Sequence, residues 1–143
     1  MTRADDLFAA HGDLLDEERF DEWLELFTDD CLYLVVSREN EERGLPLAAI
    51  RCESRGYLQD RVVAVRETSM YTPRTQRHVI GRARADGDGA ISASYAVFQT
   101  LPDEPTAVFS TGRYRARLDG GRFAELRVVY DTTLVPNSIV KPL

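Results

Sequence analysis

The sequence predicts an α+β fold in which N-terminal helices pack against one strongly curved sheet, antiparallel or mixed. Two observations carry this prediction. Helical periodicity dominates the first third of the chain, and strand patterns separated by tight turns fill the second half. The helices must bury their apolar stripes against one face of the sheet. A strongly bent sheet that wraps around helices forms a cone, and such a cone encloses a pocket.

Two amphipathic helices are predicted near the start of the chain. In residues 4–15, apolar side chains and one histidine recur at three- and four-residue steps. After the polar residues 16–18, a second apolar stripe with helical spacing runs from Phe20 to Phe27. The polar sequence 28–30 is expected to end this helix. Apolar residues within 54–66 predict a shorter third helix.

Strands are predicted for most of the remaining chain. The run 31–36 is apolar and rich in β-forming residues, 37–46 is expected to be an exposed loop, and 47–52 contains a short strand. Three turns then separate four longer strands: an Asp-Gly turn at 86–89, a proline-containing turn at 101–105 and an Asp-Gly-Gly turn at 119–121. This succession favours hairpins with consecutive strands as antiparallel neighbours. These strands are predicted at 76–85, 90–101, 106–118 and 122–135.

Size and composition limit the classes of protein. The 143 residues predict a single domain, 1–143. The net charge of −6 argues against general nucleic-acid binding, and no apolar run approaches the roughly 20 residues that span a bilayer. The N-terminus lacks the apolar stretch of a secretory signal. Two cysteines cannot form a disulfide framework, so we expect reduced, buried thiols in a cytoplasmic protein.

The distribution of charge suggests surfaces for association. Residues 1–30 hold 11 acidic and 2 basic side chains, whereas the rest of the chain is mildly basic. Arginine supplies 17 of the 18 basic residues. Arg113, Arg115 and Arg117 share one face of a strand by the period-two rule. Such a row is either a solvated face or an interface, where the planar guanidinium pairs with carboxylates. We take Arg77, His78, Arg113 and Arg115 as interface candidates.

The sequence offers no metal-ligand motif. A Rieske centre needs two cysteines and two histidines at fixed spacing. The four candidates, Cys31, Cys52, His11 and His78, form no C-x-H or C-x-x-H pair. We therefore expect no metal or other cofactor in this chain, and we interpret both cysteines as inert thiols.

The sequence also allows a catalytic interpretation, in which the cone contains a site for acid–base chemistry. A carboxylate beside a histidine in a dry pocket acquires the shifted pKa values that proton transfer needs. Asp30, Tyr33 and His78 are the catalytic residues of this hypothesis, and Tyr57 and Tyr71 are further candidates. The competing interpretation is structural: Asp30 caps a turn, the tyrosines fill the core and His78 makes a structural hydrogen bond.

Three segments resemble the small, or β, subunits of aromatic-ring-hydroxylating dioxygenases. These subunits are part of the cone-shaped nuclear transport factor 2-like superfamily, which also includes polyketide cyclases and ketosteroid isomerases. Residues 14–33 match the pattern LLDE-x-R-F-D-E-W-L-x-L-F-x-D-D-x-x-Y. Residues 73–80, PRTQRHVI, are similar to the stretch that opens a central strand in this family. Residues 112–131 resemble its closing hairpin.

The resemblance implies a structural role. Family β subunits generally carry no metal and no catalytic residue. They assemble with a larger α subunit that holds a Rieske iron–sulfur cluster and a mononuclear non-haem iron, and β subunits form a trimer in the α3β3 complex. The alternatives are a stand-alone cone-fold isomerase, dehydratase or cyclase that acts on a hydrophobic small molecule, and a carrier without catalysis. The apolar tail 134–143 is expected to dock, either by extending an edge of the sheet or by reaching a neighbouring subunit.

Overall fold

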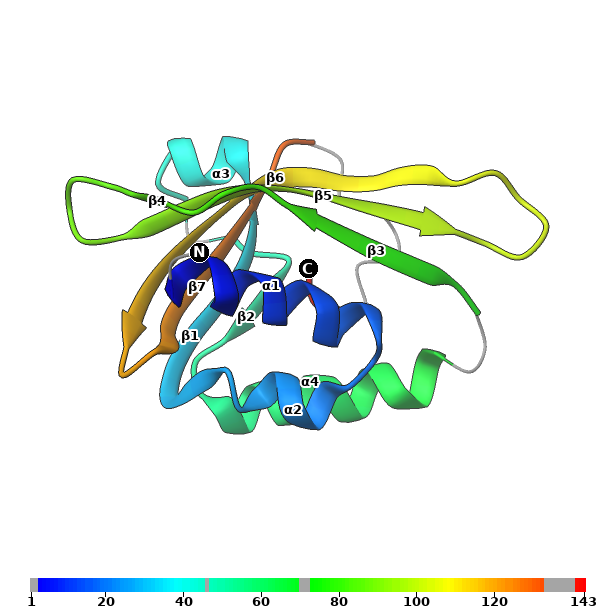
Figure 1. Cartoon of the computed structure of the whole chain (residues 1–143), viewed down its shortest axis with the longest axis horizontal. Coiled ribbons are helices and arrows are strands. Elements are labelled where there is room, and N and C mark those ends of the chain that lie inside the picture. Colours follow the sequence, from blue (N-terminus) through cyan, green and yellow to red (C-terminus); the bar gives the residue numbers. More distant parts are fainter. Residues whose placement is uncertain (1–2, 46, 70–72, 133–140) are drawn as a thin grey trace.

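The computed structural model describes residues 3–45, 47–69, 73–132 and 141–143 (Figure 1). Its helices and strands alternate early and give way to strands late, as the sequence predicts. In chain order they are α1 (Arg3–Asp16), α2 (Phe20–Leu24), β1 (Phe27–Ser37), α3 (Arg38–Glu42), β2 (Ile50–Cys52), α4 (Arg55–Ser69), β3 (Thr75–Ile80), β4 (Arg84–Ala85), β5 (Ile91–Thr100), β6 (Ala107–Asp119) and β7 (Arg122–Tyr130).

Seven strands form one mixed sheet. Its order is β2-β1-β7-β6-β5-β3, with β4 paired to β5 beside β3. The hairpins β4–β5 and β6–β7 are antiparallel, as their Asp-Gly and Gly-Gly turns predict, and β5–β6 is antiparallel across the turn at 101–105. β1 pairs with β7 in parallel, so the first strand lies beside the last. The predicted α+β class and the mixed sheet are therefore confirmed.

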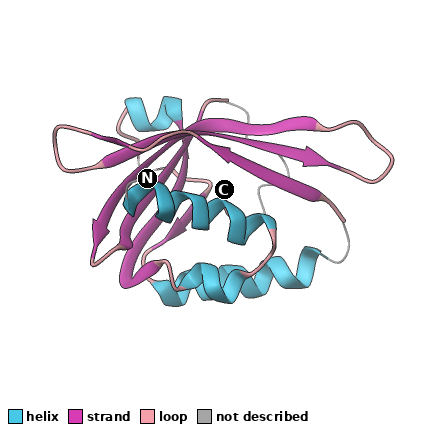
Figure 2. Cartoon of the chain, viewed as in Figure 1, coloured by secondary structure: helices cyan, strands magenta, loops and turns pink. Residues whose placement is uncertain are grey.

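The sheet bends strongly around the helices. α1 lies within the concave side, and α2 and α4 lie beyond it, whereas α3 packs on the opposite, convex side (Figures 1 and 2). The predicted cone shape is confirmed. We call the concave side the interior and the convex side the outer face.

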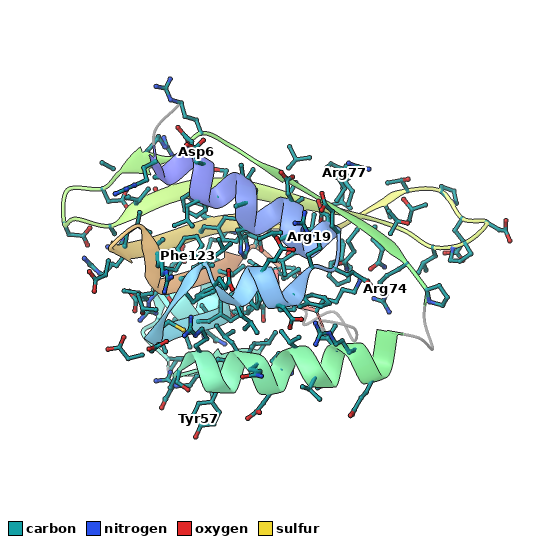
Figure 3. The ribbon with its side chains drawn as sticks, turned by 60° about the horizontal axis from the view of Figure 1, so that its bottom comes forward. Asp6, Arg19, Tyr57, Arg74, Arg77 and Phe123 are labelled. Carbon is teal, nitrogen blue, oxygen red and sulfur yellow. The ribbon has the colours of Figure 1, made fainter. Side chains whose placement is uncertain are left out.

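Aromatic side chains fill the interior. Phe27 lies 4.9 Å from Trp23 and 5.3 Å from Phe123 between ring centroids, and Phe8 stacks on Tyr114 at 5.6 Å. All five residues are buried. Figure 3 shows Phe123 beneath the N-terminal helices. Burial of each such side chain stabilises the fold by roughly 1.5–3 kcal/mol, so this cluster joins the helices to the sheet.

Two local predictions are wrong. The second helix ends at Leu24, and residues 28–30 belong to β1 rather than to a helix stop. They lie in an irregular stretch of β1 between Phe27, which stands opposite Phe123, and Leu32, which stands opposite Glu125, so the strand continues past the acidic pair. The expected loop 37–46 contains α3. Its first turn is capped by Ser37, whose Oγ accepts a hydrogen bond from the backbone N–H of Asn40 at 3.1 Å.

The predicted strand 76–85 is interrupted. Ile80 stands opposite Tyr95, and Arg84 stands opposite Ser92, so four steps along one strand face three steps along β5. This extra residue is a bulge, and it separates β3 from β4. The last strand ends at Tyr130, and positions 133–135 of the prediction lie outside the described residues.

α1 covers the edge of the sheet at β3. The Asp16 carboxylate accepts a hydrogen bond from the backbone N–H of His78, and Asp5 accepts one from Ala83. A side chain at Gly12 would bring its Cβ within 3.0 Å of Ile80 and 3.1 Å of His78, so glycine permits this close approach. The helix therefore occupies two backbone N–H groups along this edge that would otherwise be open to pairing.

Candidate functional site

A hydrogen-bonded chain crosses the interior from α2 to the C-terminal segment. The indole N–H of Trp23 donates to His11 Nδ1 at 2.9 Å, and His11 Nε2 donates to the main-chain oxygen of Leu143 at 3.2 Å. Tyr33 donates its hydroxyl proton to the same oxygen at 3.0 Å, and its Oη accepts from the Leu143 N–H at 2.9 Å. Trp23, His11, Tyr33 and Leu143 have no exposed surface. The sequence predicts that the tail docks, and its residue 143 does so, but in the interior rather than at a sheet edge or on a neighbouring subunit. Residues 133–140 lie outside the described residues.

Burial fixes the protonation of these groups. Desolvation, reinforced by the nearby His78, lowers the pKa of His11 to about 3. His11 is thus neutral at physiological pH, and the Trp23 bond to Nδ1 places its single proton on Nε2. Desolvation also raises the pKa of Tyr33 far above its usual value, so its hydroxyl stays protonated and able to donate.

His78 pairs with Asp16. Its Nδ1 lies 2.7 Å from Asp16 Oδ1, and the carboxylate accepts that proton as well as the backbone N–H of His78. The side chain of His78 is only 1% exposed. Its Nε2 and the hydroxyl of Tyr114 are buried and have no hydrogen-bond partner among the described residues. The rings of His78 and Tyr114 lie 6.0 and 5.1 Å from the His11 ring, so one polar cluster surrounds His11.

The structure separates the residues of the acid–base hypothesis. Tyr33 and His78 both contribute to the interior cluster, but Asp30 is exposed on β1. Tyr57 is 62% exposed and points away from α4 (Figure 3), and Tyr71 lies outside the described residues. The carboxylate that reaches His78 is Asp16, which sequence reasoning missed. The two residues are 62 positions apart, and no motif connects them.

Neither metal ligands nor reactive thiols gather in the described part of the chain. The described residues contain no group of three or more His, Cys, Asp or Glu side chains placed to hold a metal ion. Cys31 and Cys52 are free and buried, as predicted. Desolvation raises the pKa of Cys31 to about 11 and also raises that of Cys52, so both remain thiols.

An arginine row crosses the outer face. Strand pairing places Arg84, Ser92, Arg115, Arg127, Leu34 and Arg51 side by side, one from each of β4, β5, β6, β7, β1 and β2. Cross-strand partners share a face of the sheet, so the four arginines project to the same side. We call Arg51, Arg84, Arg115 and Arg127 the arginine row.

Carboxylates accompany this row. Arg115 and Arg117 pair with Asp88 of the β4–β5 turn. Arg127 pairs with Glu41 of α3 at 3.2 Å and with Glu125 at 3.4 Å. Such exposed pairs contribute little to stability, about 0–1 kcal/mol each, because both charges remain in water. They hold the guanidinium groups in fixed positions on the outer face.

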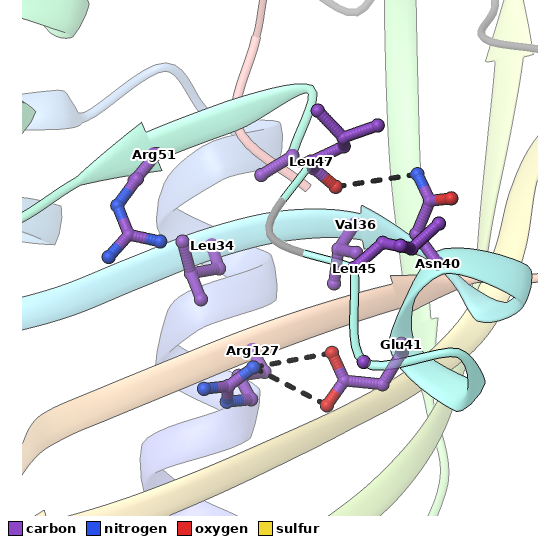
Figure 4. Close-up of a pocket in the computed structure, with 10 residues that line it drawn as sticks. Leu34, Val36, Asn40, Glu41, Leu45, Leu47, Arg51 and Arg127 are labelled. Atoms are coloured by element: carbon purple, nitrogen blue, oxygen red, sulfur yellow. Dashed lines mark hydrogen bonds and ion pairs between the residues drawn. The ribbon is translucent and has the colours of Figure 1, made fainter.

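A groove lies between this row and the segment after α3. It has a volume of about 340 Å³ (Figure 4). Leu34 and Val36 of β1 form its floor, Arg51 and Arg127 flank it, and Leu47 is 63% exposed at its rim. The Asn40 amide donates to the main-chain oxygen of Leu47 at 3.4 Å and holds the rim in place. A second hollow of about 390 Å³ continues past Glu41 toward Arg113 and Arg115.

The interface candidates do not share one surface. Arg113 and Arg115 lie on the outer face, and Arg77 is exposed on the same side of β3, opposite Phe98. His78 points into the interior instead, as strand alternation requires of the next residue. Its side chain cannot contact another protein while α1 covers it.

Comparisons with known proteins agree with this geometry. The family model described as ring hydroxylating beta subunit matches residues 10–140. The small subunit of anthranilate 1,2-dioxygenase from Burkholderia cepacia is 34% identical over 137 residues, which cover 90% of this chain and 85% of that protein. A crystal structure from Novosphingobium aromaticivorans, described as the beta subunit of an aromatic-ring-hydroxylating dioxygenase, superposes with a TM-score of 0.84 and 41% identity. That match covers 98% of this chain and 94% of the other.

The fold is shared more widely. An NTF2-like protein from Exiguobacterium superposes with a TM-score of 0.63 at 19% identity, covering 89% of this chain and 99% of the other. At this identity the match shows the fold alone, and it confirms the predicted cone architecture. The family match and the 34% identical relative show more: this chain belongs to the family of ring-hydroxylating β subunits.

Proposed function

We propose that this chain is the structural small subunit of an aromatic-ring-hydroxylating dioxygenase. The observation that carries the proposal is its likeness to a dioxygenase small subunit over 90% of the chain. In this role it binds a larger α subunit, forms a trimer with two further copies, and holds the catalytic subunits in place in the cytoplasm. The Rieske cluster and the non-haem iron are carried by the α subunit.

The side-chain chemistry of this chain supports the proposal that the iron centres belong to the α subunit and not to this chain. The described residues do not fit an iron centre, because no three potential ligands converge and both thiols are held protonated. The two histidines are committed to the interior, where one binds Leu143 and the other binds Asp16. The described helices include none that is long and apolar enough to cross a membrane.

The outer face is the proposed docking surface for other subunits. It presents the arginine row, the exposed Leu47 and two adjoining hollows. Arginine beside apolar side chains is typical of protein interfaces, since it combines a planar charged group with apolar surface. On the helical side, α1 is engaged with the edge strand β3 through Asp16 and Asp5.

Co-expression with the large-subunit gene tests the proposal. We expect a complex of fixed stoichiometry that contains iron, whereas this chain purified alone contains none. The double variant Arg113→Glu/Arg115→Glu should weaken assembly, measured by sedimentation. A matched control, Arg19→Glu/Arg66→Glu, reverses two exposed arginines on the helical side and should assemble normally. Failure of the wild-type chain to bind any large subunit would disprove the proposed role. Normal assembly of the outer-face variant would reject only the docking surface.

A further inference from the structure

Leu143 is bound in the interior much as a small ligand would be. Its side chain is fully buried in the aromatic core, and both its main-chain N–H and its main-chain oxygen are hydrogen-bonded to side chains. Neither of these bonds belongs to a helix or a strand. The recognition therefore comes from His11 of α1, the helix inside the cone, and from Tyr33 of β1, a strand of the surrounding sheet.

The donors converge on one oxygen. His11 Nε2–H and the Tyr33 hydroxyl both donate to the Leu143 oxygen, at 3.2 and 3.0 Å. Trp23 holds the imidazole in the tautomer that donates. Two fixed donors aimed at one acceptor, within an apolar enclosure, suit the oxygen of an amide or a carboxylate.

The interior holds more polar groups than Leu143 uses. The rings of His78 and Tyr114 both pack against the His11 ring, and His78 Nε2 and the Tyr114 hydroxyl are buried and have no partner among the described residues. Buried polar groups without partners are rare, and each calls for an explanation. Asp16 orients His78 so that Nε2 is the atom left for a further contact.

We propose that the space around His11 is a binding site for a small apolar molecule that carries an amide or carboxylate, and that Leu143 occupies it as an intramolecular ligand. Such a molecule displaces Leu143, accepts hydrogen bonds from His11 and Tyr33, and can reach His78 and Tyr114. This site is separate from the outer face, so it goes beyond the proposed role in assembly.

The attachment of the C-terminal segment is compatible with displacement. Lys141 pairs with Glu18, whose side chain is 45% exposed, and an ion pair with so exposed a partner is weak. Among residues 141–143, loss of that pair would leave the hydrogen bonds of Leu143 and the apolar contacts of Pro142 and Leu143. An external molecule that reproduces those contacts competes with it directly.

The test uses the full-length Leu143→Gly variant, which removes the buried side chain. Trp23 is the single tryptophan, and its indole is bonded to His11, so its fluorescence reports on the site. The probes are N-acetyl-L-leucinamide, which carries the amide, and 4-methylpentanoate, which carries the carboxylate. N-acetylglycinamide, which lacks the isobutyl group, is the control. We expect at least one of the two isobutyl compounds to change the fluorescence saturably and to raise the melting temperature, whereas the control does neither.

A second substitution tests the geometry. Adding Tyr33→Phe removes one donor and retains the ring, so affinity should fall by about fivefold to tenfold. If Leu143→Gly does not fold, the comparison is between wild type and Lys141→Gln, which loosens the segment. The probe should then bind the variant more tightly than wild type. Absence of saturable binding by the folded variant, equal binding by wild type and Lys141→Gln, or affinity unaffected by Tyr33→Phe would overturn the proposal.

Discussion

The interior and the outer face of this sheet differ in how their polar groups are used. In the interior, His11, Tyr33 and Asp16 each hydrogen-bond to a group that is itself buried. On the outer face, arginines and carboxylates pair in contact with water. Substitution of a polar residue in the interior should therefore lower the free energy of unfolding strongly, whereas substitution of a polar residue on the outer face should lower it little. Residues on the outer face can therefore serve binding to another subunit without contributing much to the stability of the fold.

The sharpest form of this contrast compares two apolar truncations. Phe123→Ala leaves a cavity among Phe8 and Phe27 and should lower the free energy of unfolding by about 3–5 kcal/mol. Val108→Ala, at a position 60% exposed on β6, should change it by less than about 0.5 kcal/mol. Urea unfolding followed by Trp23 fluorescence measures both. Similar losses of unfolding free energy in the two variants would contradict the proposed difference between the interior and the outer face.

A polar change in the interior should have the next largest effect. Asp16→Ala removes the acceptor for two N–H groups of His78 and should destabilise the protein by about 2–3 kcal/mol. Asp13→Ala alters an exposed carboxylate on the same helix and serves as the matched control. Thermal unfolding of the two variants side by side gives the comparison, and equal melting temperatures would show that the Asp16–His78 pair contributes nothing.

Lowering the pH should destabilise the folded protein through protonation of His11 in the interior. The pKa of His11 is about 3 in the folded protein and 6.5 for the ordinary side chain. Between these values the unfolded chain binds a proton that the folded chain excludes. The free energy of unfolding therefore falls as pH decreases below 6.5, by up to about 1.4 kcal/mol per pH unit. His11→Gln, whose amide can accept from Trp23 and donate to Leu143, should show a shallower decline between pH 7 and 5. If His11→Gln showed the same slope as wild type, His11 would not be the source of the pH dependence.

The smallest effect is expected on the outer face. Arg115→Gln breaks the pair with Asp88 and should change the free energy of unfolding by no more than about 1 kcal/mol. Salt at high concentration should reduce even that difference, because exposed charges are screened. Chemical denaturation at two salt concentrations tests this. A loss above about 2 kcal/mol would mean that the arginine row supports the fold itself.

Local patterns predicted much of the fold. The apolar spacing of α1, the Asp-Gly turn before β5 and the Gly-Gly turn before β7 act over a few residues, so the helix and these hairpins could be inferred directly. The parallel pairing of β1 with β7 joins residues almost a hundred positions apart, and no local pattern specifies it. α3 was missed because its acidic sequence has no apolar stripe, and only the Ser37 cap marks its start.

The candidate site was predictable only in part. Tyr33 and His78 were chosen for their chemistry, and both do lie in the interior cluster. Their partners come from distant positions: Asp16 at the end of α1, and Leu143 at the end of the tail. The exposed Asp30 illustrates the limit of such reasoning, because an acidic residue next to a strand gives no indication of which face it occupies until the register is known.

The bond between His11 and Leu143 has a consequence for synthesis on the ribosome. The two residues are separated by 132 positions, so α1 emerges long before its partner exists. Throughout that interval the imidazole and the Tyr33 hydroxyl lack the group that they hold in the finished protein. The nascent polypeptide can form hairpins as they emerge, but the centre of the cone is completed only after residue 143 has been added.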